Sequence, residues 1–291
     1  MIKYLKKCAV KAYIEIGTTL FPKRFANIFY RGAMGKNIDW KNPMDLNEKI
    51  NWMKFNYDTS IWSRLADKYL VREYVEERGL SNILVKLYGV WSNANDIDFD
   101  KLPNQFVLKT NHGCGTIIVV EDKSKLDISS VRKTLNKWLK VRFGRNTVEP
   151  HYLKIQPLII AEELLINDNE ASSSLVDYKV FCLNGSPYSI LVCANRGNGH
   201  VDKGFYDVAW NFMPQMSDCQ NIDNMPRPQK LQEMIDSSVI LSKGHPQVRV
   251  DFYEVQGCLY FGEMTFTSLG GYMNYITPSK LIEMGNLVKL G

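Results

Sequence analysis

Turns that contain glycine and separate β-rich apolar runs constrain the fold of this 291-residue chain more than any other feature of its sequence. Asn184-Gly185 divides the run 176–196, and Gln256-Gly257 divides the run 248–271. Asn-Gly between apolar strands is a strong hairpin signal, because both turn residues must adopt a positive φ. A third run, 106–122, has two glycines between its apolar halves. The sequence therefore predicts antiparallel hairpins.

Helical patterns and two further strands occupy most of the remaining chain. Residues 1–62 are expected to be helical, with Asp45 or Asn47 capping one helix. The clearest helix is 64–79, which ends at a glycine and carries Lys68 and Arg72 on one side. Further elements are expected as a helix at 127–143 and strands at 83–91 and 156–165. These elements predict an α+β fold.

Composition describes an ordinary globular protein with a basic N-terminal segment. The net charge is +5, and residues 1–49 alone carry ten Lys or Arg against four acids. Lys11 and Glu15 interrupt the apolar residues of the first twenty positions, which excludes a signal peptide and a transmembrane helix. Two interpretations stay open: a terminal helix packed on its own domain, or a peripheral contact with the anionic inner face of a membrane. Beyond residue 49 no basic surface continues, so nucleic acid is not expected as a partner.

Cysteine and histidine usage argues against structural zinc. The six cysteines are scattered without a CxxC pair, and the four histidines lie far apart in the sequence. This pattern is typical of reduced thiols in a cytoplasmic protein.

The stretch "FVLKTNHGCGT" (106–116) places a lysine at the end of an apolar strand. Burying Lys109 without a partner would be costly, and a phosphate is one anion that could meet it. Gly113 and Gly115 would let backbone N–H groups approach that anion closely. An ordinary hairpin loop with an exposed lysine is the alternative on this fragment alone.

Two acidic residues lie at nearly equal distances from the turn at Gln256-Gly257. Asp251 and Glu263 could face each other across the hairpin if a bulge intervenes. Like charges opposite each other in a sheet are destabilising, and a Mg²⁺ ion between them would remove that cost.

In order along the chain, these segments resemble the ATP-grasp superfamily, and most closely its TupA-like branch, found with bacterial surface-polysaccharide biosynthesis. The resemblance covers about 67–278 and is carried by "DKYLVREYV", "FVLKTNHGCGT", "IIAEELL", "DYKVFCLNG", "CANR" and "VRVDFYEVQGCLYFGEMTFTSLGG". It implies an ATP-grasp fold, in which two α/β subdomains clamp ATP, preceded by the helical basic region. The expected divisions are a helical region 1–62, an N-terminal part of the core 63–100, a lid with the glycine loop 101–160, and a C-terminal subdomain with the metal site 161–291.

The resemblance also implies roles for individual residues. Nucleotide contacts are implied for a set drawn from the strand lysine, the glycine flap and a hinge: Lys68, Lys109, Asn111, His112, Gly113, Gly115, Thr116, Glu162, Glu163, Leu164 and Asp177. Lys179 and Arg196 are implied to be catalytic, with Arg196 meeting the transferred phosphate. Asp251, Glu263 and Thr265 are implied to be Mg²⁺ ligands. Many superfamily members have asparagine where Thr265 stands, so this threonine is the weakest member of the set.

The expected activity is therefore an ATP- and Mg²⁺-dependent ligase that activates a carboxylate as an acylphosphate and joins it to an amine. Implied partners are a uronic acid of a surface polysaccharide or its precursor, and an amino acid. A glycosyltransferase is the rival enzyme, with "DIDFD" (96–100) as its DxD-like segment. A membrane-surface scaffold is the non-enzymatic rival, but it leaves Lys109, Asp251 and Glu263 without a role.

Overall fold

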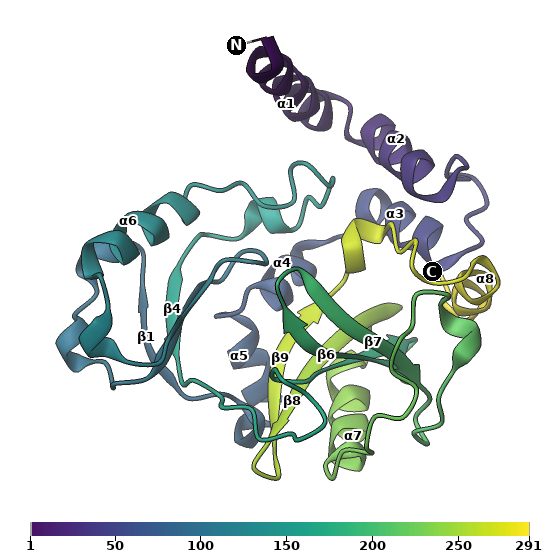
Figure 1. The fold of residues 1–291 in the computed structure, drawn as a ribbon. Helices are drawn as coiled ribbons and strands as arrows, with labels where there is room; N and C mark the ends of the chain where they lie inside the picture. Colours follow the sequence, from purple (N-terminus) through teal and green to yellow (C-terminus); the bar gives the residue numbers. More distant parts are fainter. Residues whose placement is uncertain (1, 291) are drawn as a thin grey trace.

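Two antiparallel sheets with helices packed against them form the body of the protein (Figure 1). The computed structural model describes residues 2–290, with side chains described for residue 10 and residues 12–290. The helices are α1 (Ile2–Leu20), α2 (Pro22–Met34), α3 (Leu46–Asn56), α4 (Ser60–Ala66), α5 (Val71–Glu77), α6 (Ile128–Trp138), α7 (Leu231–Ser242) and α8 (Pro278–Leu287). The strands are β1 (Leu87–Trp91), β2 (Phe106–Thr110), β3 (Ile117–Val120), β4 (Ile159–Glu162), β5 (Asp177–Leu183), β6 (Ser186–Gly197), β7 (His200–Tyr206), β8 (Gln247–Val255) and β9 (Cys258–Thr265).

The smaller sheet has the strand order β1-β4-β2-β3 and is covered on one face by α6. Side chains alternate along β2, so that Phe106 and Leu108 pack under α6 while Val107 and Lys109 point to the opposite face. This opposite face is turned toward the second sheet. The apolar strand composition therefore builds a core on one side and leaves the other side for a ligand.

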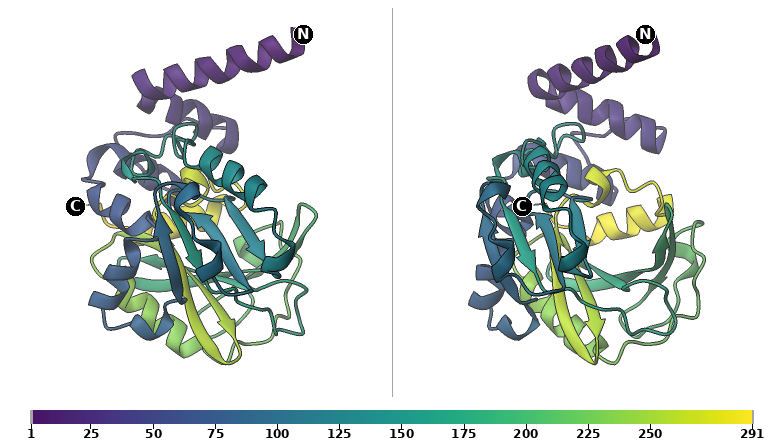
Figure 2. Two further views of the ribbon diagram at one scale, coloured as in Figure 1. Left: turned by 90° about the vertical axis from the view of Figure 1, so that its left-hand side faces the viewer. Right: turned by 60° about the vertical axis from the view of Figure 1, so that its left-hand side comes forward.

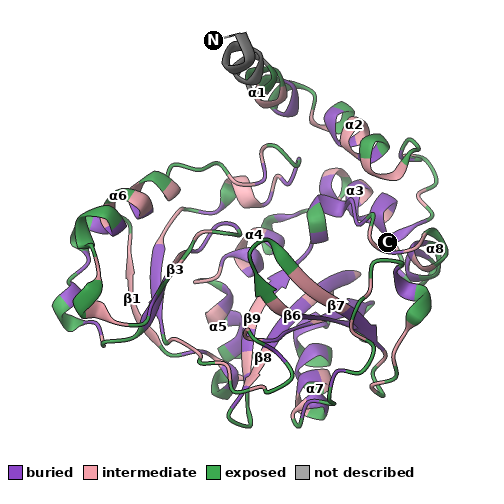
Figure 3. Cartoon of the chain, in the orientation of Figure 1, coloured by how far each residue is buried: buried purple, intermediate pink, exposed green. Residues whose placement is uncertain are grey.

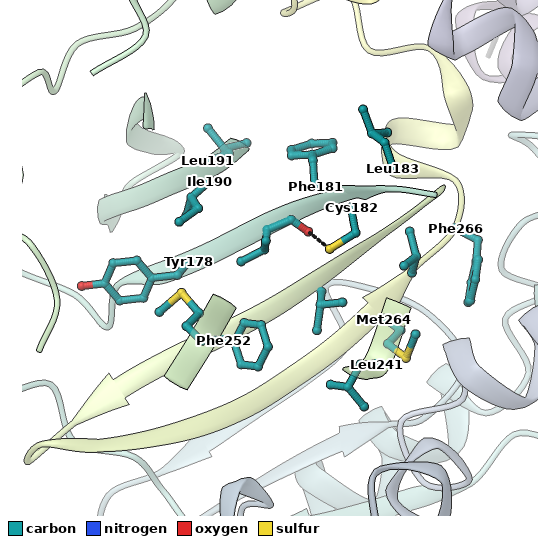
Figure 4. Close-up of a cluster of buried hydrophobic side chains, with 14 of the residues drawn as sticks. Tyr178, Phe181, Cys182, Leu183, Ile190, Leu191, Leu241, Phe252, Met264 and Phe266 are labelled. Carbon is teal, nitrogen blue, oxygen red and sulfur yellow. Dashed lines mark hydrogen bonds between the residues drawn. The ribbon is translucent and has the colours of Figure 1, made fainter. Parts of the chain in front are cut away.

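The larger sheet has the order β7-β6-β5-β8-β9 and packs against α7. Figure 4 shows part of its core, in which Tyr178 of β5, Ile190 of β6, Phe252 of β8 and Leu241 of α7 meet. The burial colours of Figure 3 place the buried strands at the centre of the molecule. Both predicted hairpin turns are confirmed, because Asn184, Gly185, Gln256 and Gly257 all have positive φ.

The N-terminal region is helical, as predicted, and it divides into two parts. Helices α1 and α2 stand away from the sheets in all views (Figures 1 and 2), whereas α3 packs against α8. Asp45 is the N-cap of α3 and forms a capping box with Glu48, whose backbone N–H lies 2.9 Å from the Asp45 carboxylate. The alternative cap, Asn47, lies inside the helix.

The predicted single helix over 64–79 is wrong. The chain forms α4 and α5, separated by a turn at 67–70 in which the Asp67 carboxylate accepts the backbone N–H groups of Tyr69 (2.8 Å) and Leu70 (3.2 Å). Aspartate competes with the helix for backbone donors in this way. As a result, Lys68 lies in the turn and Arg72 on α5, so they do not share one helix face.

Other elements are shorter than predicted. The first strand begins at Leu87, after a short 3-10 helix at Ser81–Ile83, and the helix expected to reach residue 143 ends at Trp138. Asp127 caps that helix by accepting the backbone N–H of Ser130. The small sheet takes its strands from 87–162, so the expected division at residue 100 falls inside it.

Candidate active site

A cavity of about 610 Å³ lies between the two sheets. Thirteen of the sixteen residues expected from the sequence line it: Lys68, Lys109, Gly113, Gly115, Thr116, Glu162, Glu163, Leu164, Asp177, Lys179, Arg196, Asp251 and Glu263. These residues come from the turn before α5, the small sheet, the segment after β4 and the large sheet. The fold thus gathers side chains that are up to 195 positions apart in the sequence (from Lys68 to Glu263).

One part of the cavity wall is apolar. Ile117 and Val119 of β3 are 54% and 51% exposed, and both line the cavity from the small sheet. Leu164 and Leu175, from the segment between β4 and β5, and Phe261 of β9 also line it. Apolar walls on two sides suit a flat aromatic ring, which buries its faces and leaves its polar edge to backbone groups.

Lys109 meets a carboxylate at the end of β2. Its Nζ lies 2.5 Å from Glu162 Oε2, and Arg72 Nη1 lies 3.6 Å from Glu162 Oε1. Both Lys109 and Glu162 side chains are largely buried on the cavity face of the small sheet. The anion that offsets the cost of burying this lysine is therefore a protein carboxylate, and a phosphate would join or replace it.

The glycine loop between β2 and β3 is closed at its base by Thr110 and Thr116, whose hydroxyl oxygens lie 2.6 Å apart. Gly115 has a φ of +72°, as expected of a loop glycine. Gly113 is needed for a different reason, because a Cβ there would lie 2.8 Å from the ring of Phe143. The Lys68 ammonium donates to the Gly113 carbonyl oxygen at 2.8 Å and so ties the loop to the turn before α5.

The predicted facing of Asp251 and Glu263 is confirmed. They are paired in the ladder of β8 and β9, and the register shifts between Asp251 and Phe252, so that Gly262 is the extra residue of a bulge. A Cβ on Gly262 would lie 3.0 Å from the Asp251 carbonyl oxygen and 3.2 Å from the Tyr253 ring. The bulge brings two carboxylates to the same face of the sheet at the cavity wall.

Three cations hold these two carboxylates. Arg249 donates to Asp251 through two nitrogens, at 2.6 and 2.8 Å, and to Glu263 at 3.1 Å. Lys179 lies 2.7 Å from Asp251, and Lys68 lies 3.0 Å from Glu263. Burial alone would raise the pKa of Glu263, but these cations outweigh burial and hold that pKa well below its usual range. The Glu263 carboxylate is therefore charged at neutral pH, as a metal ligand must be.

At the adjoining end of the cavity, Asp177 receives an Arg196 nitrogen at 2.9 Å and lies 3.3 Å from Lys179. The Arg196 side chain is 55% exposed, so it is available to a ligand that enters from solvent. Burial and the charges of Asp177, Asp251 and Glu263 raise the pKa of Tyr253 well above its ordinary value. Tyr253 is therefore a neutral hydroxyl in a charged surrounding.

The donor set fits a Mg²⁺ ion. Two carboxylates are in place, and the Thr265 hydroxyl donates to Glu263 at 3.0 Å, although Thr265 does not itself line the cavity. Among the residues that the structure describes, no group of three or more His, Cys, Asp or Glu could hold a metal ion. Mg²⁺ commonly uses one or two carboxylates together with phosphates and water, which matches this arrangement.

Asn111 and His112 do not line the cavity, so their positions do not support a nucleotide contact. Asn111 is fully buried, and its side chain bonds the backbone of Gln156 and Leu158 at 3.0 and 2.7 Å. A ring nitrogen of His112 lies 3.0 Å from the Val141 carbonyl oxygen. Both residues fasten the glycine loop to neighbouring segments.

Arg249 and Tyr253 belong to the site but were missing from the expected set. Both lie two positions from Asp251, and alternate residues of a strand share one face. The segment "VRVDFYEV" therefore carried a signal for both residues. What the sequence could not indicate is that Arg249, whose side chain is only 13% exposed, would bridge the two acids.

Solved structures of several ligases are similar to this chain at low sequence identity. D-alanine–D-alanine ligase from Bacillus anthracis has 16% identity, a TM-score of 0.48, and coverage of 77% of this chain and 67% of that one. The ATP-grasp ligase PsnB with its minimal precursor has 12% identity, a TM-score of 0.43, and coverage of 80% of this chain and 62% of that one. N5-carboxyaminoimidazole ribonucleotide synthetase from Thermus thermophilus has 12% identity, a TM-score of 0.39, and coverage of 83% of this chain and 52% of that one. This chain thus spans between half and two thirds of the length of these structures.

No curated protein matches the chain. The family model described as TupA-like ATPgrasp matches residues 48–289, which is most of the sequence and begins within α3. This match confirms the ATP-grasp family and fold expected from the sequence segments. The chain belongs to the TupA-like ATP-grasp family.

Proposed function

We propose that this protein phosphorylates a carboxylate with ATP and joins the resulting acyl group to an amine. The observation that carries the proposal is the division of one cavity into an apolar part and a charged part with two paired carboxylates, Asp251 and Glu263, and four lining cations, Lys68, Lys109, Lys179 and Arg196. The apolar part suits the base of a nucleotide. The charged part suits the triphosphate and the reacting carboxylate.

The chemistry requires little covalent participation by the protein. A carboxylate oxygen of the substrate bonds to the γ-phosphorus as ADP leaves, and the amine nitrogen then bonds to the acyl carbon as phosphate leaves and the amine loses a proton. Lys68 and Lys109 would neutralise the phosphates, and Lys179 would neutralise charge on the acylphosphate. Asp251 and Glu263 would hold Mg²⁺, which would supply positive charge against the negative charge of the phosphates. The glycine loop would exclude water from the acylphosphate.

The finer substrate assignment is a uronic acid of a bacterial surface polysaccharide, or its precursor, with an amino acid as the amine. Arg196 supports an anionic acceptor, because its exposed guanidinium lies at the cavity beside Asp177. The polysaccharide context rests on the family resemblance.

The segment "DIDFD" argues against the glycosyltransferase alternative. Asp98 is exposed, caps a short 3-10 helix by accepting the Asp100 N–H, and pairs with Lys101 at 3.1 Å. None of the three aspartates of this segment lines the cavity between the sheets. A sugar-nucleotide site would need these carboxylates to converge in a cavity.

We also propose a cytoplasmic location with a peripheral contact to an anionic membrane surface. Four apolar side chains of α1, Val10, Tyr13, Ile16 and Leu20, are each about 60% exposed. The sequence of the same helix carries four lysines and a single acid. No described helix is long and apolar enough to cross a bilayer, so this contact would be peripheral. The fraction of the full chain that co-sediments with vesicles containing phosphatidylserine should fall when Tyr13 and Ile16 are replaced by serine. Binding equal to that of wild type would contradict the membrane contact.

The ligase proposal is tested by ADP release from Mg²⁺-ATP with glucuronate or galacturonate and each amino acid, with hydroxylamine as a small amine that traps an acylphosphate as a hydroxamate. The expected result is hydroxamate formation that requires ATP, Mg²⁺ and a uronate and is lost in Asp251→Asn. Glu283→Gln is the matched control, because Glu283 is an exposed carboxylate paired with Lys280 outside the cavity. ATP binding without hydroxamate would contradict the uronate assignment. Turnover of a UDP-sugar without ATP would contradict the proposed ligase function.

A further inference from the structure

Helix α3 carries a row of buried polar side chains. Asn47, Asn51 and Lys54 are 0%, 0% and 3% exposed, and their spacing of four and three residues places them on one side of the helix. A buried amide or ammonium is costly unless its hydrogen bonds are made. The partners of this row therefore indicate what it does.

All three side chains bind the backbone of one loop. Asn47 accepts the Met273 N–H at 3.1 Å, Asn51 donates to the Gly271 carbonyl oxygen at 2.8 Å, and Lys54 donates to the Gly270 carbonyl oxygen. Figure 1 shows α3 beside the yellow C-terminal segment that contains this loop. These contacts join segments more than 200 positions apart in the sequence.

The loop that these three α3 side chains bind, residues 267–273, has an unusual backbone. Leu269, Gly270 and Gly271 are three successive residues with positive φ (48°, 67° and 77°), a conformation that leucine rarely adopts. Leu269 is also 58% exposed, so its own packing does not hold the loop in this shape. At Gly271 a Cβ would lie 2.9 Å from the Ile50 side chain of α3, so the helix and the loop are in close contact.

The other end of the loop reaches the candidate active site. Arg249, which holds Asp251 and Glu263, has its Nη1 3.4 Å from the Ser268 hydroxyl oxygen. Thr267 donates to the buried Glu149 carboxylate at 2.5 Å. The loop also directly follows β9, which carries Glu263. A shift of the loop would therefore displace the Arg249 side chain.

We propose that Asn47, Asn51 and Lys54 are positioning residues that hold loop 267–273 against Arg249 and thereby fix Asp251 and Glu263, the two carboxylates that would hold Mg²⁺. This inference rests on the proposed ligase function for the identity of the reaction. It makes the helical N-terminal region part of the catalytic unit through α3. Because Arg249 bonds both Asp251 and Glu263, the inference assigns to α3 an effect on Mg²⁺ binding through these two carboxylates.

Amide hydrogen exchange of the full chain, with and without Mg²⁺-ATP, tests the structural half of this proposal. The variant is Asn51→Leu, and Asn47→Ala serves if Asn51→Leu does not fold. The matched control is Asn56→Leu on the same helix, whose exposed amide donates only to the Trp52 carbonyl oxygen. Loss of a buried hydrogen bond should speed exchange in 267–273 by about tenfold. Unchanged exchange in that peptide, in a variant that folds, would overturn the proposal.

The hydroxamate assay with glucuronate adds a readout that a purely structural role would not move. At fixed ATP, we expect the Mg²⁺ concentration for half-maximal activity to rise about tenfold or more in Asn51→Leu and to stay within about twofold in Asn56→Leu, since small misplacements of interacting groups cost about 10- to 100-fold. An unchanged Mg²⁺ requirement in Asn51→Leu, or an equal rise in Asn56→Leu, would overturn the positioning role. Wild-type protein that binds Mg²⁺-ATP but forms no hydroxamate contradicts the uronate assignment instead, and hydrogen exchange then decides the loop assignment.

Discussion

His151 gives a stability prediction whose size follows from the structure. Its side chain is fully buried, neither ring nitrogen has a hydrogen-bond partner, and its ring centroid lies 5.7 Å from that of Trp62 in an edge-on contact. Burial, together with the charges of Lys54 and Lys154, lowers the pKa of His151 from 6.5 to about 3. The folded protein therefore keeps this ring neutral at pH values where the unfolded chain is protonated.

The sign and size of the effect of His151 on the free energy of unfolding follow from proton linkage. Because the folded-state pKa is depressed, the stability contributed by neutral His151 is fully present above the unfolded pKa of 6.5. It is lost as the pH falls toward 3. One pH unit in this window is worth about 1.4 kcal/mol, so acidification from pH 7 to pH 5 should cost about 2 kcal/mol through His151 alone.

Urea unfolding followed by tryptophan fluorescence at pH 7 and pH 5 measures this cost. We expect wild type to lose about 2 kcal/mol more than His151→Phe between the two pH values. His200→Gln is the control, because the His200 side chain is 65% exposed, and it should follow wild type. Equal losses in wild type and His151→Phe would refute the assignment of a buried, neutral, unpartnered imidazole.

Three further predictions concern the site itself. Asp251→Asn should lower the free energy of unfolding by about 3–5 kcal/mol in urea titrations, because it leaves two buried cations with one carboxylate fewer. Gly113→Ala should cost about 1–3 kcal/mol, since its Cβ would clash with Phe143, and a wild-type melting temperature would contradict that contact. Lys109→Met should raise the dissociation constant of Mg²⁺-ATP by about 10- to 100-fold in calorimetry, and an unchanged constant would place the phosphates elsewhere.

Much of the fold could be predicted because local signals agreed with the final structure. The turns at Asn184-Gly185 and Gln256-Gly257 fixed two hairpins, and counting from the second turn brought Asp251 opposite Glu263. The helix 64–79 could not be predicted correctly from its periodicity. Asp67, in the middle of that pattern, satisfies backbone donors that a continuous helix would need.

The contacts between distant segments could not be predicted from the sequence. Lys109 was expected to meet a phosphate, yet its partner in this structure is Glu162, on a strand fifty residues away. Arg249 bridges two acids only because a bulge at Gly262 sets the register. The N-terminal helices looked peripheral to the core, but α3 holds a loop beside the site, a relation that depends on tertiary packing alone.

The central claim, a nucleotide site between the two sheets, is tested most directly by thermal unfolding with and without Mg²⁺-ATP. The proteins to compare are wild type, Glu263→Gln and the exposed control Glu283→Gln. At about one hundred times the dissociation constant, a ligand that binds only the folded state adds about 2.7 kcal/mol of stability. The account predicts this gain for wild type and Glu283→Gln, its dependence on Mg²⁺, and its loss in Glu263→Gln. No gain with Mg²⁺-ATP, but a gain with a UDP-sugar, would contradict it.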